Sequence, residues 1–373
     1  MGETTMRTNV ILTSLVLGFA LLQPTSLIAA ELRYATYIPA TSSNNTKGVL
    51  PLFEAVKANT GGRLSFSFYP GGQLLDARAM LSGIKDGIAD AGFLVVPYYP
   101  SELKHAAVIP GMVTFGSNPV ATAGAVLETY LLDCPKCNAD FTDNGVIFLA
   151  GHATTPYNIL CSKPVASVND LKGLKMRTAG GGLAREVEAL GGVPVSMTSG
   201  EVYEGLQRGQ IDCVIAPKAW LRQYSLAEVV KFIYDVPLGS IGGLGLMTMN
   251  INKWKGLDDA DRTMILKELP GMVARVVLDG YVADDKMGID AAEKAGIEIV
   301  AAPQELHDKL AIFRQTELAE VERSATERGV ENAREITGAY LDNLKKWNSL
   351  AEDIGTNSDK YREVLWREIY SKL

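Results

Sequence analysis

The sequence predicts an α/β protein with a parallel sheet, in a chain of 373 residues that is long enough for two domains. The main observation comes from residues 171–217, where short apolar segments alternate with segments of helical spacing. A hydrophobic fraction of 47% indicates a folded core rather than disorder. The expected elements are a strand at 174–177, a helix at 183–190, a strand at 193–195, a helix between Thr198 and Gly209, and a strand at 211–215.

Two helix boundaries in this stretch have recognisable chemistry. Gly191 and Gly192 end the first helix, since glycine adopts the left-handed C-terminal conformation at little cost. Thr198 and Glu201 form a T-x-x-E capping box at the start of the second helix. Parallel α/β sheets bind ligands beyond the carboxyl ends of their strands, so we expect a site at these strand ends.

Arg177 lies at such a strand end. Its guanidinium is charged at any working pH and presents a planar fork that matches a carboxylate. Gly180, Gly181 and Gly182 follow, and then a helix begins, whose free N–H groups favour an anion. The alternative is that Arg177 pairs with a surface acid and that the glycines only form a turn.

The same stretch resembles the substrate-binding proteins of TRAP transporters, the DctP-type family of extracellular solute-binding proteins. The resemblance rests on the ordered segments TGGRLSFSFYPGGQL, LKGLKMRT, LGGVPVSM and GEVYEGLQRGQID, which lie within residues 33–212. It implies a two-lobed periplasmic-binding-protein fold, in which each lobe is a sheet flanked by helices and a long helix spans both lobes. It also implies that the arginine matching Arg177 binds the carboxylate of a small organic ligand between the lobes.

Other candidate contacts follow from the positions at which this family meets its ligand. The loop after the first strand offers Tyr37, Ile38 and Thr41. The stretch 95–99, at the end of the strand expected at 91–96, offers Val95 and Tyr98, where relatives often have polar contacts. The alternatives are ordinary loop chemistry for the first group and simple surface cover for the tyrosine.

The chain after residue 150 adds four candidates. His152 lies where some relatives have a second carboxylate-binding arginine, although a lone histidine is more often structural. Ala216 stands where many relatives have an asparagine that contacts the ligand. Lys218 offers a second charge, and Trp220 or Tyr224 offers a stacking face unless it serves only to pack the lobe.

These residues favour a monocarboxylate with an apolar or aromatic body as the ligand. The alternative ligand is a C4-dicarboxylate whose second charge meets Lys218 or His152. The resemblance implies that the partners are the small and large membrane subunits of a TRAP transporter; a membrane receptor, with this chain as its ligand sensor, is the alternative. A net charge of −7 argues against nucleic acid as a partner.

The predicted organisation begins with a signal peptide at residues 1–30. It combines Arg7, an apolar run at 10–22 that is too short to span a membrane, and the small residues Ala29 and Ala30, and it predicts a periplasmic protein. The first lobe is expected at 31–150 and 239–280, the second lobe at 151–238 and 281–335, and a C-terminal helical tail at 336–373.

The four cysteines fall into two groups. Cys134 and Cys137 predict a local disulfide in an oxidising compartment. A redox role is the alternative, but this pair follows an expected helix end and opens no clear helix. Cys161 and Cys213 lie in strand-like segments and are expected to be buried thiols, or a second bridge if they are adjacent.

Enzymatic activity is not predicted. The sequence has no G-x-S-x-G elbow, Walker A loop or H-E-x-x-H motif. Gly180 and Gly182 faintly resemble a dinucleotide fingerprint, but Arg185 stands where its third glycine would be. A zinc site would need four ligands, and there is no second C-x-x-C and no pair of histidines. We therefore expect neither a cofactor nor a metal.

Overall fold

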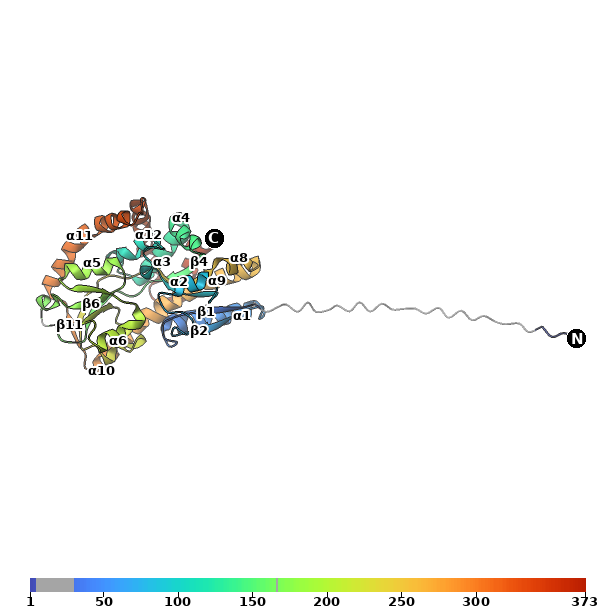
Figure 1. Cartoon of the computed structure of the whole chain (residues 1–373), viewed down its shortest axis with the longest axis horizontal. Helices are drawn as coiled ribbons and strands as arrows, with labels where there is room; N and C mark the ends of the chain where they lie inside the picture. Colours follow the sequence, from blue (N-terminus) through green and yellow to red (C-terminus); the bar gives the residue numbers. More distant parts are fainter. Residues whose placement is uncertain (5–29, 166) are drawn as a thin grey trace.

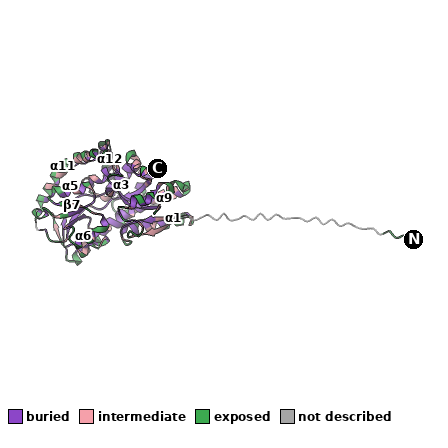
Figure 2. Cartoon of the chain, in the orientation of Figure 1, coloured by how far each residue is buried: buried purple, intermediate pink, exposed green. Residues whose placement is uncertain are grey.

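The structure, a computed structural model, describes residues 1–4, 30–165 and 167–373. The predicted signal peptide lies largely outside the described residues. The chain forms the predicted two-lobed α/β fold, with one mixed sheet in each lobe and helices around both sheets (Figure 1). Buried residues concentrate in these sheets and in the helix faces that cover them (Figure 2).

The first lobe is built on a five-stranded sheet, with the spatial order β2-β1-β3-β10-β4. β1 pairs in parallel with β2 and β3, whereas β10 pairs antiparallel with β3 and β4. β4 extends to His152, so the chain leaves this sheet two residues later than expected. The strands are β1 (Ala30–Ala35), β2 (Leu64–Tyr69), β3 (Ala91–Val95), β4 (Val146–His152) and β10 (Leu244–Asn250).

The second lobe is built on a six-stranded sheet, with the order β11-β9-β5-β8-β6-β7. β6 pairs in parallel with β7 and β8, which confirms the parallel arrangement predicted for residues 171–217. The capping box of Thr198 and Glu201 is present. The strands are β5 (Asn158–Cys161), β6 (Lys175–Thr178), β7 (Val193–Ser196), β8 (Cys213–Ala216), β9 (Phe232–Asp235) and β11 (Glu298–Ala301).

Short helices cover the two sheets. α2 begins at Met80, because Asp76 Oδ1 accepts hydrogen bonds from the backbone N–H groups of Arg78 and Ala79 in the turn before it. These helices are α1 (Leu50–Asn59), α2 (Met80–Lys85), α3 (Pro119–Glu128), α4 (Pro135–Asp143), α5 (Gly181–Ala189), α6 (Val202–Gln207), α7 (Trp220–Gln223) and α8 (Ile251–Gly256).

One long helix spans both lobes, as predicted. It consists of α9 (Asp259–Ala274), the π-helical segment η9 (Arg275–Val282) and α10 (Ala283–Lys294), which follow one another without a break. α9 contacts α1 and β4 in the first lobe, whereas α10 contacts α7 and β11 in the second. The residue ranges given above for the two lobes stay a prediction.

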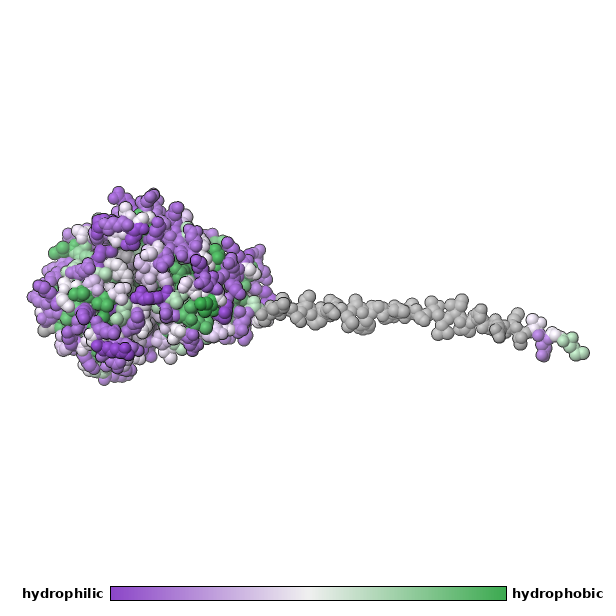
Figure 3. All heavy atoms as spheres, in the orientation of Figure 1, coloured by the Kyte–Doolittle hydropathy of each residue, from purple (hydrophilic) through white to green (hydrophobic). Residues whose placement is uncertain are grey.

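The last three helices close the chain around the outside of the molecule. α11 (Gln304–Glu327) contacts α5 of the second lobe, and α12 (Ala333–Ile354) then packs along α3 of the first lobe (Figure 1). α13 (Ser358–Glu368) packs on α9. On the face shown in Figure 3, hydrophilic residues predominate and hydrophobic residues form separate patches.

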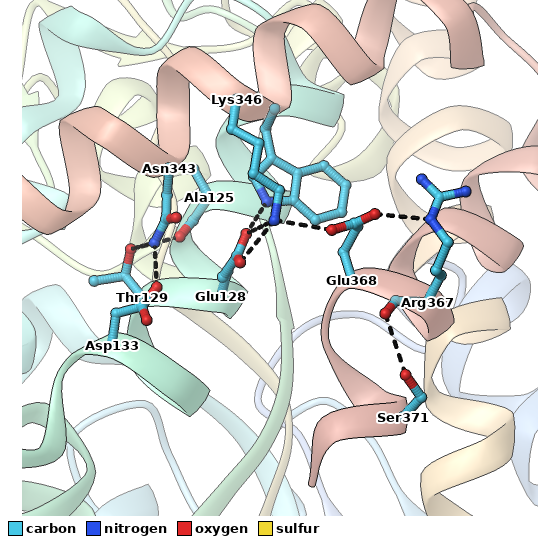
Figure 4. A network of polar contacts seen from close by, with 10 residues as sticks. Ala125, Glu128, Thr129, Asp133, Asn343, Lys346, Arg367, Glu368 and Ser371 are labelled. Carbon is cyan, nitrogen blue, oxygen red and sulfur yellow. Dashed lines mark hydrogen bonds and ion pairs between the residues drawn. The ribbon is translucent and has the colours of Figure 1, made fainter.

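A polar network anchors the predicted C-terminal tail on α3. Lys346 Nζ lies 2.8 Å from Glu128 and 3.0 Å from Glu368, and so joins α12 to α3 and α13 (Figure 4). The buried indole of Trp347 donates to the same Glu128 carboxylate over 2.7 Å. The ring lies so close to Gly124 that a Cβ at this position would be 2.2 Å from it. The tail is therefore an integral part of the first lobe.

Both cysteine pairs form disulfides. The local bridge predicted between Cys134 and Cys137 is present, and Cys161 is bridged to Cys213 across the paired strands β5 and β8. The expectation that the first pair opens no helix was wrong. Cys134 is the N-cap of α4, its Sγ accepts a hydrogen bond from the Cys137 N–H, and Pro135 begins the helix, where a proline is favoured.

The two bridges should differ in what they contribute to stability. Cys161–Cys213 joins residues 52 apart, whereas Cys134–Cys137 joins residues 3 apart. Loop-closure entropy then predicts about 4 kcal/mol for the long loop and about 2 kcal/mol for the short one. We expect the variant Cys161→Ala/Cys213→Ala to lose clearly more unfolding free energy in urea than Cys134→Ala/Cys137→Ala. Equal losses would contradict the loop-length argument.

Candidate functional site

A small cavity lies between the two lobes. Its walls come from the first lobe, the second lobe and the long helix, so a molecule inside would contact all three. The lining residues are Tyr37, Phe93, Val95, Pro97, Tyr98, Tyr157, Arg177, Ala179, Ser199, Trp220, Tyr224, Ile241, Leu244 and Tyr281.

Arg177 carries the only charge among the described residues that line this cavity. It belongs to β6, at the strand end where the sequence placed it, and its side chain is 0% exposed. Its Nε donates to the backbone oxygen of Met197 over 2.8 Å, and its Nη2 donates to the Tyr98 hydroxyl over 3.1 Å. The guanidinium carbon lies 5.1 Å from the centre of the Trp220 ring. These contacts fix the orientation of the guanidinium.

The guanidinium is nevertheless incompletely satisfied. Nη1 of Arg177 is buried and has no hydrogen-bond partner among the described residues, and no carboxylate among them forms an ion pair with Arg177. The indole N–H of Trp220 is likewise buried without an acceptor in the described part of the chain. Because burying an unpaired charge costs several kcal/mol, this arrangement favours an anionic acceptor in the cavity.

Hydroxyl groups surround the guanidinium and connect the lobes. Besides the Arg177 hydrogen bond, the Tyr98 hydroxyl of the first lobe accepts one from the Ser199 N–H of the second lobe, over 2.9 Å. Tyr224 donates to Ser199 Oγ over 3.2 Å, and Ser199 Oγ donates to the Tyr37 hydroxyl over 3.4 Å. The lobes are thus held together directly beside Arg177.

Four buried tyrosines of the cavity remain protonated at neutral pH. Burial raises the pKa of Tyr157 to about 12, against the opposing effect of the nearby Arg177 charge. Burial likewise raises the pKa values of Tyr37, Tyr224 and Tyr281. These side chains therefore offer neutral hydrogen-bond groups and add no negative charge next to Arg177.

The remaining walls of the cavity are apolar. Phe93 and Val95 come from β3, Leu244 begins β10, and Ile241 lies in the segment that leads to it. The ring of Tyr37 packs against Phe93, with 5.7 Å between ring centres. The cavity thus combines one cationic, hydroxyl-rich region with an aliphatic and aromatic one.

The structure brings together half of the predicted contact residues. Tyr37, Val95, Tyr98, Arg177 and Trp220 line the cavity. The other five do not: Ile38, Thr41, His152, Ala216 and Lys218.

Ile38 and Ala216 are fully buried in the protein core, and Thr41 is exposed. Lys218 Nζ lies 2.5 Å from Asp235, which satisfies its charge on the protein itself.

His152 lies directly behind the cavity wall. Its ring stacks on Phe93 and Tyr281, with ring centres 6.1 and 5.1 Å apart. Burial lowers its pKa to about 4, so it is neutral at pH 7. Nδ1 lies 3.2 Å from the Ala153 oxygen and Nε2 lies 3.1 Å from Asn44 Nδ2, which assigns the proton to Nδ1. His152 therefore supports two lining rings instead of reaching the cavity.

The three glycines after Arg177 line a different cavity. Gly180, Gly181 and Gly182 line a neighbouring cavity, which shares only Pro97 with the first. A Cβ on Gly182 would lie 2.5 Å from the backbone oxygen of Gly111 in the first lobe. Gly182 therefore allows the two lobes to approach each other closely. It does not provide space for a ligand beside Arg177.

Several lining residues were not among the predicted contacts, including Phe93, Tyr157, Ser199 and Tyr281. Tyr157 follows the crossing between the lobes, and Ser199 begins the helix after the capping box. Both positions could have been chosen from the strand-end rule, whereas Tyr281, in the middle of the long helix, has no distinguishing signal in the sequence.

Two other features of the described residues bear on the class of protein. No helix among them has the length and apolar character needed to cross a membrane. No group of three or more histidine, cysteine or acidic side chains among them is arranged to hold a metal ion. Two lobes around a cavity that holds a buried arginine and partly apolar walls have the architecture of a solute-binding protein.

Comparison with known proteins identifies the family. Residues 35–315 match the DctP family, described as bacterial extracellular solute-binding protein, family 7, and the chain belongs to it. The members and structurally similar proteins are solute-binding proteins of TRAP transporters, not enzymes. The chain is 26% identical to the 2,3-diketo-L-gulonate-binding periplasmic protein YiaO of Escherichia coli over 292 residues, 76% of this chain and 85% of that protein.

Solved structures share the fold. A TRAP solute-binding protein from Rhodoferax ferrireducens in complex with copurified benzoate superposes with a TM-score of 0.75 at 21% identity, covering 87% of this chain and 100% of that one. A TRAP periplasmic solute-binding protein from Bordetella bronchiseptica, with bound (R)- and (S)-mandelate, gives a TM-score of 0.72 at 22% identity, covering 85% and 99%.

Proposed function

We propose that this protein captures a monocarboxylate with an apolar or aromatic body and delivers it to the membrane subunits of a TRAP transporter. The observation that carries the proposal is the buried guanidinium of Arg177, whose Nη1 points to no acceptor among the described residues. A ligand carboxylate would supply that acceptor. A charge-assisted hydrogen bond of this kind is stronger in a cavity that excludes water.

The charge balance of the cavity supports one carboxylate rather than two. Arg177 is the single charged residue among the described lining residues. Lys218 is paired with Asp235, and His152 is neutral and lies behind Phe93 and Tyr281. A second carboxylate would be buried without a cationic partner, at a cost that disfavours C4-dicarboxylates.

The proteins of similar fold support an aromatic body. Two of them were solved with benzoate and with mandelate, each a monocarboxylate with one aromatic ring, whereas others hold pyroglutamate or orotic acid, which are also monocarboxylates. The rings of Tyr37, Phe93, Trp220 and Tyr281 and the aliphatic side chains of Ile241 and Leu244 provide matching apolar surface.

Family membership supports the remaining parts of the proposal. Members serve as the substrate-binding component of TRAP transporters, and the curated relatives include periplasmic proteins. We therefore place the protein in the periplasm, after removal of a signal peptide, and expect it to dock on a small and a large membrane subunit.

A thermal-shift screen of the purified protein tests the ligand class. The panel compares benzoate, mandelate and 2-oxo acids with succinate and malate. A monocarboxylate at 100 times its Kd should add about 2.7 kcal/mol of stability, which raises Tm measurably. We expect this shift from monocarboxylates with an apolar body and little or none from the dicarboxylates.

The opposite pattern would overturn the ligand class. If succinate or malate shifts Tm and benzoate does not, a second cationic contact must form that the lining residues do not provide. A tightly bound ligand that remains through purification would mask all shifts. Mass spectrometry of the supernatant after denaturation detects such a ligand, and its number of carboxylates decides the same question.

A further inference from the structure

Asp284 connects the two lobes behind the cavity. It lies on α10, one helical turn after Tyr281, and is 5% exposed. Its Oδ2 accepts hydrogen bonds from Ser43 Oγ and from Gln223 Nε2, the latter over 2.7 Å. Its Oδ1 accepts one from Arg222 Nη1 over 3.3 Å. One buried carboxylate therefore binds three side chains from two separate segments of the chain.

The first of these segments belongs to the first lobe. Ser43 follows the loop that carries Tyr37 and immediately precedes the π-helical segment η1 (Asn44–Val49). η1 packs on η9 of the long helix, and η9 presents Tyr281 to the cavity. Ser43 is thus the point at which the first lobe meets the Asp284 carboxylate.

The second segment is α7 of the second lobe, which is only 4 residues long. It begins with Trp220, and Tyr224 follows its end; both line the cavity. Asp285, the neighbour of Asp284, accepts a hydrogen bond from the Ala219 N–H over 2.6 Å, just before α7. A helix this short is not stable alone, so its place depends on these contacts with the long helix.

We propose that Asp284 is a positioning residue that stabilises the closed arrangement of the lobes, by holding Ser43 of the first lobe and α7 of the second on one carboxylate. The inference rests on the proposed function, because a residue that stabilises the closed lobes matters only if the lobes close around a ligand. Opening of the lobes would withdraw Ser43 and leave one of the hydrogen bonds of a buried carboxylate unmade, which is costly. Asp284 touches no ligand, so it should affect all ligands alike.

The distance between the lobes tests this inference without any ligand. Spin labels on Lys57→Cys in α1 and Gln207→Cys in α6 report the distance by pulsed electron paramagnetic resonance, since both positions are exposed and the native cysteines are bridged. We expect Asp284→Asn to shift the distribution toward longer distances. Ser43→Ala should do the same while leaving Arg222 and Gln223 paired with Asp284, so it remains informative if Asp284→Asn fails to fold.

The control is Asp279→Asn. Asp279 lies on the same long helix, is exposed and accepts a hydrogen bond from Ser358. We expect its distance distribution to match that of the native protein. A merely structural role for Asp284 would lower Tm without changing the interlobe distance. Unchanged distributions in both Asp284→Asn and Ser43→Ala would overturn the inference.

Benzoate binding separates this inference from the proposed function. We expect Ser43→Ala to release benzoate at least threefold faster, with an unchanged association rate, because the closed state is lost sooner. If Arg177→Ala abolishes benzoate binding while Ser43→Ala dissociates at the native rate, the proposed function stands and the inference about Asp284 is wrong. If benzoate binds equally to native protein and Arg177→Ala, the proposed function fails, and the distance measurement alone decides the role of Asp284.

Discussion

Arg177→Ala should weaken the binding of the best monocarboxylate in the screen by about 30-fold to 1,000-fold or more. Removing one partner of a buried, hydrogen-bonded charge pair costs about 2–5 kcal/mol, and each 1.4 kcal/mol is about tenfold in Kd. The loss arises mainly because the ligand carboxylate would then be buried without a cation. The described lining residues include no other charge to replace it. Isothermal titration calorimetry with the native protein and the variant measures the ratio.

Two further variants show whether the effect is specific. Arg177→Lys keeps the charge but loses the planar fork that contacts Met197 and Tyr98, so its affinity should lie between those of the native protein and Arg177→Ala. Arg208→Ala, at an exposed arginine of the same lobe, should bind as the native protein does. Near-native affinity in Arg177→Ala would remove this residue from the site.

Glu186→Gln should raise Tm by several degrees at pH 8 and have little effect near pH 5. Glu186 lies on α5, is 1% exposed, and neither carboxyl oxygen has a hydrogen-bond partner among the described residues. Burial raises its pKa to about 8; Arg314 opposes this shift and Glu317 adds to it, both from α11. Between pH 4.5 and about pH 8, the folded protein therefore keeps the Glu186 carboxyl protonated, whereas an unfolded chain would ionise it.

The direction of the pH effect follows from that difference. Below pH 4.5, the ordinary pKa of a glutamate, Glu186 is protonated in both the folded and the unfolded chain, so it costs no unfolding free energy. As pH rises from 4.5 toward about 8, only the unfolded chain ionises, and the folded protein loses unfolding free energy. At about 1.4 kcal/mol per unit of pKa, the loss is on the order of 3–5 kcal/mol. Glutamine has the same shape and does not ionise, so it removes the loss.

The matched control for this prediction is Glu188→Gln. Glu188 is an exposed glutamate on the same helix, two residues further on. Its Tm should differ little from that of the native protein at either pH. A Glu186→Gln variant whose Tm difference from the native protein is the same at pH 5 and pH 8 would contradict the assignment of a buried, protonated carboxyl.

The position of Arg177 was predictable because it depends on a local rule. Strand, turn and helix in residues 171–217 are each specified by nearby residues, and parallel strands place their carboxyl ends on the same side of the sheet. The structure has these elements, with boundaries shifted by a few residues at most. The resemblance then supplied the two lobes, which no local pattern specifies.

The aromatic part of the cavity was less predictable for a physical reason. Phe93, Tyr157 and Tyr281 occur in apolar segments, and an apolar side chain suits a protein core as well as a ligand cavity. Ala216 and Lys218 lie at or just after the end of β8, as Arg177 lies near the end of β6, yet Lys218 turns to Asp235 and Ala216 is buried in the core. Side-chain direction at a strand end depends on register and neighbours, which the spacing alone does not give.

The disulfides likewise show that local sequence patterns do not predict contacts between distant segments. Cys134 and Cys137 are neighbours in the chain, so their bridge could be predicted, whereas the bridge of Cys161 to Cys213 requires that β5 and β8 pair antiparallel in one register. The helix after Cys134 was missed because cysteine is an uncommon N-cap residue, although Pro135 is typical of a first helical position.

The placement of the two disulfides also limits what oxidation can do to this molecule. Cys134–Cys137 lies at the start of α4 in the first lobe, and Cys161–Cys213 joins two strands of the second. Each lobe is therefore cross-linked within itself, while the lobes are joined by main-chain crossings and by noncovalent contacts such as those of Tyr98 and Asp284. Neither disulfide joins the two lobes, so no covalent bond would have to break if the lobes separated to let a ligand enter or leave.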